Sequence, residues 1–320
     1  MTGEVLIVEA DPRGDFTPYA IGIAAAAAAG LLASGLAAVL GRKRESATGL
    51  RWGPTVGIGV GFLLGQAMIL GWLTRPQLLD AKSALMAWRS DGGAFPLFPG
   101  EAAHWMPWLG GAALLFGLLE GWKPAPGWAR WENRLGLTAL TLWLLLGNRF
   151  GGSWEPTEGT MWLLGLGLAM LVFWSVIDRR AERLGPSMPL VLMMMASALS
   201  ISLYLSFMIF GCLFAAALAA TLGGVWVVSW FDPKMNLARG AIAVFVVLYV
   251  GLLVCYLFYS DLPRISVLAL ALAPLATYVD RVGPVSRLSG WKSAAIRIGV
   301  LIVPLAVAIG AAFAARNAMM

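Results

Sequence analysis

Histidine, cysteine and charged residues are all scarce in this sequence. It contains one histidine, His104, and two cysteines, Cys212 and Cys255, and only 12% of its residues are charged. Both cysteines lie inside apolar runs, and no other metal-ligating residue type clusters around the histidine. This composition disfavours a disulfide framework, a zinc site, an iron–sulfur cluster and a bis-histidine haem. We therefore expect no cofactor and no bound metal.

Apolar residues make up 59% of the chain, and they gather in long runs separated by charge, proline or glycine. A helix needs about 20 apolar residues to cross the hydrocarbon layer of a membrane. The sequence predicts an all-α integral membrane protein, a polytopic bundle of about ten transmembrane helices with mostly short loops. The predicted spans are Pro18–Leu40, Pro54–Leu73, Trp105–Leu119, Leu135–Leu146, Met161–Ile177, Met188–Leu205, Phe207–Trp230, Ala241–Tyr259, Ile265–Val279 and Ile298–Ala314.

The stretch from Met188 to Trp230 carries no charge and is about twice as long as a single span. We predict a tight hairpin at Tyr204–Phe207. A long tilted helix followed by a re-entrant segment is the alternative.

The lysines and arginines give the predicted orientation. When the connections between the ten spans are taken alternately, one set holds 16 of the 23 cations. Cytoplasmic loops are enriched in Lys and Arg, so this set is predicted to be cytoplasmic and both termini to lie on the outer side. The expected location is the cytoplasmic (inner) membrane of a bacterium.

The chain is expected to form a single transmembrane domain, with possible halves 1–183 and 187–320 on either side of Gly185-Pro186. Residues 74–103 form the only long outer connection, and the spacing of Leu78, Leu85 and Trp88 predicts a short interfacial helix within it. On the cytoplasmic side, Trp122–Arg134 is predicted to be a loop along the membrane surface. Most tryptophans fall at predicted membrane edges, where indoles act as anchors.

Small residues recur every four positions in three of the predicted spans. In a bilayer, such stripes let two helix backbones approach closely. We predict that each of these three spans lies at a crowded helix crossing within the bundle, with a homodimer face as the alternative. The stripes are Gly22, Ala26, Gly30 and Ser34; Gly53, Gly57, Gly61 and Gly65; and Gly211, Ala215, Ala219 and Gly223.

Ionisable residues inside a span are a default sign of function, and almost none occur here. Five acidic residues are expected at span ends within reach of water: Glu120, Asp178, Asp232, Asp261 and Asp280. The polar candidates within the membrane are Gln66 and the helix face that carries Ser197, Ser200 and Tyr204. These side chains would either line a path for a neutral solute or hydrogen-bond to neighbouring helices.

Further candidates fall in the predicted outer connections: Asp80, Arg89, Glu101, His104 and Arg149. A histidine near carboxylates can perform acid–base chemistry, but no spacing among these residues matches a catalytic motif. We read them as an outer docking surface or site and assign no catalytic residue.

The sequence leaves three functions, of which we favour the first and keep the second as its alternative. The first is a permease or channel-like carrier for a small neutral solute, and the second is a non-catalytic structural or accessory subunit of a larger membrane assembly. The third is a membrane-embedded lipid-modifying enzyme. The expected partners are the lipid bilayer and other membrane subunits or a second copy of the chain, held through small-residue helix faces. No nucleic acid is expected.

Overall fold

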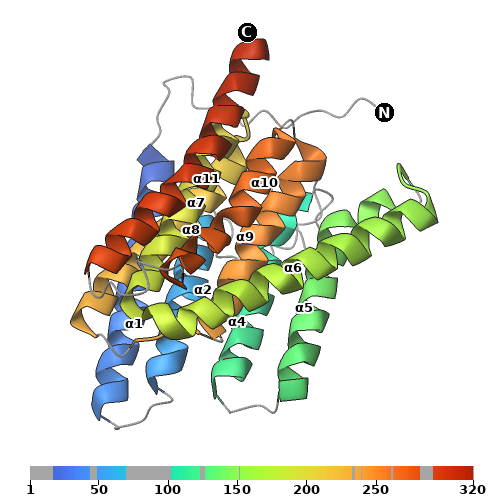
Figure 1. Cartoon of the computed structure of the whole chain (residues 1–320). Helices are drawn as coiled ribbons and strands as arrows, with labels where there is room; N and C mark the ends of the chain where they lie inside the picture. Colours follow the sequence, from blue (N-terminus) through green and yellow to red (C-terminus); the bar gives the residue numbers. More distant parts are fainter. Residues whose placement is uncertain are drawn as a thin grey trace.

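The computed structural model describes residues 17–43, 49–69, 102–122, 127–150, 152–232, 235–238, 240–260, 262–281 and 291–319. Helices dominate these residues, which contain no named strand (Figure 1). The α-helices are α1 (Thr17–Lys43), α2 (Gly49–Ile69), α4 (Met106–Trp122), α5 (Gly127–Leu146), α6 (Pro156–Leu184), α7 (Met188–Leu205), α8 (Ile209–Phe231), α9 (Gly240–Tyr259), α10 (Arg264–Leu272) and α11 (Trp291–Met319). The 3-10 helices are η2 (Ala102–Trp105), η3 (Gly147–Arg149), η4 (Gly185–Ser187) and η5 (Ala273–Arg281).

The multi-pass helical membrane class predicted from the sequence is confirmed. Within the described residues, seven helices are long and apolar enough to cross a membrane. Two shorter apolar helices, Gly53–Ile69 and Arg264–Val279, correspond to two more of the predicted spans. The remaining predicted span lies in α5, whose first two turns are polar.

The predicted hairpin between α7 and α8 is also confirmed. Helix α7 ends at Leu205 and α8 begins at Ile209. At the turn, Phe207 adopts a left-handed backbone conformation with φ of 60°, and the Ser206 hydroxyl donates to the Ser202 carbonyl (3.0 Å). The uncharged stretch is therefore two antiparallel helices and not one long helix.

Helices α1, α2 and α8 cross through glycines, much as the stripes predict. A Cβ atom added at Gly61 would lie 2.6 Å from Thr221 Cγ2 of α8 and 2.9 Å from the Ala26 carbonyl oxygen of α1. One at Gly65 would lie 2.7 Å from Ala26 Cβ. On α8, however, the residue that meets α1 is Gly224, next to the predicted stripe and not in it.

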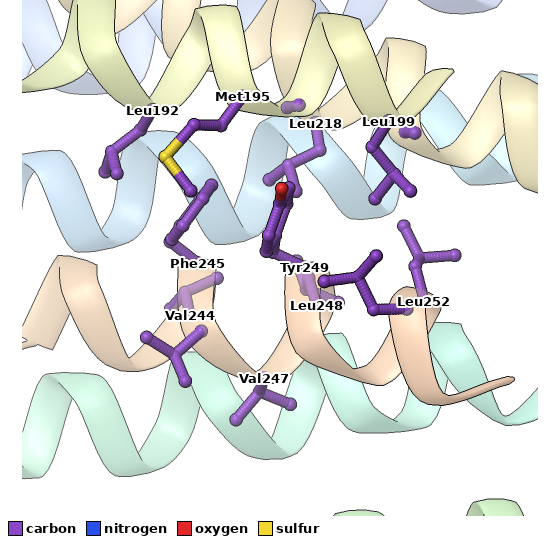
Figure 2. Close-up of a cluster of buried hydrophobic side chains, with 14 of the residues drawn as sticks. Leu192, Met195, Leu199, Leu218, Val244, Phe245, Val247, Leu248, Tyr249 and Leu252 are labelled. Carbon is purple, nitrogen blue, oxygen red and sulfur yellow. The ribbon is translucent and has the colours of Figure 1, made fainter. Parts of the chain in front are cut away.

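Helix α9 forms the centre of the bundle. In an 18-residue apolar stretch of α9, 83% of the residues are buried within the chain. A helix that is apolar on every side is buried in this way. Figure 2 shows Phe245 and Tyr249 of α9 pointing toward Met195 of α7 and Leu218 of α8. The rings of Phe245 and Tyr249 stack 5.0 Å apart. Helices α4, α5 and α6 also contact α9, so it joins two groups of helices.

The prediction of a loop along the membrane surface at Trp122–Arg134 is wrong for residues 127–134. Residues 127–134 are not a loop but the first two turns of α5, which begins eight residues before the predicted span. Helix α6 also extends the predicted span at both ends and runs obliquely to its neighbours (Figure 1). Polar residues obscured these helix ends in the sequence, since charge was taken to mark the boundaries of each helix. The predicted interfacial helix at Leu78–Trp88 lies outside the described residues.

Candidate functional site

Three charged side chains form a buried cluster between α4, α5 and α6. Arg134 of α5 donates from Nη2 to Glu120 Oε1 of α4 at 2.9 Å and to Asp178 Oδ2 of α6 at 2.6 Å. The exposed fractions of the three side chains are 9% for Arg134, 3% for Glu120 and 16% for Asp178. We call Glu120, Arg134 and Asp178 the ionic cluster.

The local fold explains why these residues meet. Helices α4 and α5 are consecutive and separated by only a short connection, so the last turn of α4 lies near the first turns of α5. Helix α6 then brings Asp178 to the same place, and Trp174, one turn earlier on α6, lies 5.3 Å from the Arg134 guanidinium. A cation over an indole face gains a further electrostatic attraction. The cluster therefore ties three helices together at one end of the bundle.

The expectation that the acidic residues at span ends reach water is wrong for Glu120 and Asp232. Each is only 4% exposed. A carboxylate so far removed from water needs a partner of opposite charge or hydrogen-bond donors, and Arg134 supplies both to Glu120. The side chains of Asp261 and Asp280 lie outside the described residues.

A cavity of about 160 Å³ opens beside the ionic cluster, between α5 and α6. Polar and apolar groups share its lining equally, and three of the groups are guanidiniums. The lining residues are Gly127, Arg130, Trp131, Arg134, Ser175, Asp178 and Arg179. We call this space the arginine pocket.

The other candidates within the membrane occupy different places. Gln66 of α2 is fully buried, and neither polar atom of its amide has a hydrogen-bond partner among the described residues. It follows Phe62 by one helical turn, on the side of α2 where Phe62 lies near Gly110 of α4 and Leu248 of α9. Gln66 therefore lies on a face packed against other helices.

The predicted hydroxyl face of α7 is divided among three environments. Ser200 is buried and donates its hydroxyl hydrogen to the Cys212 carbonyl of α8 at 2.9 Å. Tyr204 is 58% exposed at the end of the helix, and Ser197 is half-buried. Helix α8 contacts both α2 and α7, so Gln66 and Ser200 belong to helices that pack on the same neighbour.

Of the predicted outer residues, the structure describes Arg149 and His104. Arg149 of η3 donates to the Phe258 carbonyl, and its guanidinium lies 4.6 Å from the Tyr259 ring and 5.6 Å from the Trp154 ring. His104 lies in η2, which contacts α5 and α9. Asp80, Arg89 and Glu101 lie outside the described residues.

The described residues contain no group of three or more His, Cys, Asp or Glu side chains placed to hold a metal ion. The polar contacts described above join one helix to another. Compared with protein-family models, with curated proteins and with solved structures, the chain matches none of them.

Proposed function

We propose that this chain is a non-catalytic structural or accessory subunit of a larger membrane assembly. The observation that carries this proposal is the outward face of α11. In an 18-residue apolar stretch of α11, only 22% of the residues are buried within the chain. Six small residues on this helix are exposed: Ala295, Gly299, Ala306, Gly310, Ala314 and Ala318. A Cβ atom added at Gly299 or Gly310 would meet nothing within 4 Å.

These glycines differ from those between α1, α2 and α8. Glycine inside a helix is about 1 kcal/mol less favourable than alanine, so a helical glycine is explained when another backbone lies against it. Gly57, Gly61 and Gly65 meet this condition within the chain, whereas Gly299 and Gly310 do not. Small residues that face outward allow a further helix to approach the backbone of α11. That helix would belong to another membrane subunit or to a second copy of this chain.

Replacing Gly310 tests this proposal. Gly310→Leu should leave the chain folded, because the added side chain enters open space. It should release the chain from its assembly, since the leucine would hold the two helix backbones apart. The measurement is the size of the particle extracted from the native membrane. Gly136→Leu is the matched control, because Gly136 is an equally open glycine on α5 but has large side chains, Glu132 and Leu140, four positions away on either side. Equal particle sizes for both variants and the unaltered chain would count against docking on α11.

A carrier for a small neutral solute is the second candidate, and the buried amide of Gln66 favours it. Burying an amide without hydrogen bonds costs about 1–3 kcal/mol. A polar solute or water molecule that reaches Gln66 would satisfy its Nε2 and Oε1 atoms. The bond from Ser200 to the Cys212 carbonyl favours the subunit instead, because it uses a predicted path residue to join two helices.

The proposal also includes the number of membrane crossings and the side of the membrane on which the two termini lie. We propose ten crossings of a bacterial cytoplasmic membrane, with both termini on the outer side. The distribution of cations supports it. So do two contacts of α11: Arg297, in its second turn, donates to Ser187 just before α7, and Arg316, near its end, lies 5.1 Å from the Phe207 ring in the α7–α8 turn. Helices α7 and α11 therefore run in the same direction, as the alternation requires.

Thiol labelling of intact cells tests both the topology and the carrier. In a chain without Cys212 and Cys255, Ser83→Cys should react with an impermeant reagent and Ser46→Cys should not. The opposite pattern would reverse the proposed orientation.

Ser200→Cys should be protected from a small hydrophilic reagent on both sides of the membrane, because Ser200 is buried between α7 and α8. Reaction of Ser200→Cys would favour the carrier over the subunit.

A further inference from the structure

We propose that the arginine pocket binds the phosphate group of an anionic phospholipid. The pocket lies between α5 and α6, beside the end of α4. Basic pockets between transmembrane helices on the cytoplasmic side are typical binding sites for anionic lipid headgroups. The predicted orientation places this end of the bundle on the cytoplasmic side.

The formal charge of the site matches one phosphodiester. Arg130, Arg134 and Arg179 line the pocket and bring three positive charges. Asp178 in the lining and Glu120 behind it bring two negative charges, and both accept hydrogen bonds from Arg134. The set therefore carries a net charge of +1, which the single negative charge of a phosphodiester would neutralise.

The ionic cluster holds one side of this site in place. Arg134 is bound to two carboxylates and lies against Trp174, so its guanidinium has a defined position before any ligand arrives. Arg179 is exposed and Arg130 is half-buried, so both lie nearer the surface than Arg134. Guanidinium groups suit phosphate because their planar N–H donors match its oxygens. The arrangement is an anchored arginine at the back and two arginines nearer the opening.

The surroundings favour a lipid over free phosphate. Trp131 lines the pocket and is 48% exposed, and Trp128 of the same helix is 66% exposed. Leu135, one turn further along α5, is 51% exposed. Indoles favour the headgroup layer, and an exposed leucine beyond them can contact an acyl chain. Free phosphate would gain nothing from these apolar side chains.

Native mass spectrometry of the purified full chain tests the site. The probes are phosphatidylglycerol, which is anionic, and phosphatidylcholine, which is zwitterionic. We expect one phosphatidylglycerol to be retained in preference to phosphatidylcholine. Each arginine near an anionic membrane surface contributes about 1 kcal/mol, so Arg130→Gln combined with Arg179→Gln should weaken retention by about thirty-fold. Arg183→Gln should not, because Arg183 lies at the same end of α6 and outside the pocket lining.

A second variant separates the pocket from general surface charge. Ser175 lines the pocket, and its hydroxyl donates to the Leu171 carbonyl of its own helix. Ser175→Phe should fill the space without changing any charge and should also abolish the retained lipid. Retention that is unchanged in Ser175→Phe, or equally reduced in Arg183→Gln, would overturn the proposal. Displacement of the lipid by millimolar inorganic phosphate would overturn the assignment to a lipid and identify a soluble phosphate ligand instead.

Discussion

Gly61→Leu should prevent this chain from folding, because Gly61 lies where α2 is pressed against both α1 and α8. Even a Cβ atom at this position would lie within 3.1 Å of Thr221 Cγ2, the Ala26 carbonyl oxygen and the Gly30 nitrogen. Two of these atoms belong to the backbone of α1, so the clash cannot be relieved by turning a side chain. The cost should exceed the ~1–3 kcal/mol that overpacked cores typically show. The yield of monodisperse protein after mild extraction measures the effect.

Leu64→Ala is the matched control on the same helix. Leu64 is 41% exposed on the outside of the bundle, so its truncation should change stability by at most about 0.5 kcal/mol. A folded yield for Gly61→Leu equal to that of Leu64→Ala would refute the close crossing of α1, α2 and α8.

Arg134→Leu should produce the second large effect, because it leaves two carboxylates near each other without their shared cation. Removing one partner from a buried ion pair typically costs about 3–5 kcal/mol. Both carboxylates of the ionic cluster are well shielded from water, and their exposed fractions are 3% for Glu120 and 16% for Asp178. We expect the thermal unfolding temperature in lipid nanodiscs to fall sharply. Arg183→Leu, which removes an exposed arginine from α6, should leave that temperature nearly unchanged.

A triple variant distinguishes lost charge balance from lost packing. Glu120→Gln, Arg134→Met and Asp178→Asn together remove every charge of the ionic cluster while keeping side chains of similar size. Replacing a complete buried ion cluster by neutral residues is often neutral or stabilising. The triple variant should therefore recover most of the stability that Arg134→Leu loses. If the triple variant is as unstable as the single one, the charges are not the cause.

The sequence predicts the helical class and the hairpin because both follow from local patterns. An uncharged stretch twice the length of one span has to turn within it, and the structure places the turn at Ser206 and Phe207. The stripe that contains Gly57, Gly61 and Gly65 identified a crowded crossing, because one helical face is encoded at a fixed spacing. The partners across each crossing are not encoded in this way. The contact of Gly224 with α1 could therefore not be predicted.

The ionic cluster was not predicted, and its contact with α6 could not have been, for the same reason. Asp178 is 44 residues from Arg134, and no local pattern joins positions so far apart. The rule that charge marks the end of a span also hid the first two turns of α5. A usable signal did exist, since Glu120 and Arg134 lie on opposite sides of one short connection and carry opposite charges. Pairing charges across each short connection would have suggested their contact.

The mass of the particle that contains this chain in its native membrane tests the proposed function most directly. The chain alone has a mass of 34.0 kDa. Extraction of the untagged protein with its surrounding lipid, followed by mass measurement of the protein part, should give a particle heavier than one copy of the chain. A crosslinker placed at Gly310 should join the chain to a partner helix or to a second copy. A particle that contains a single copy of this chain and no other protein would contradict the account.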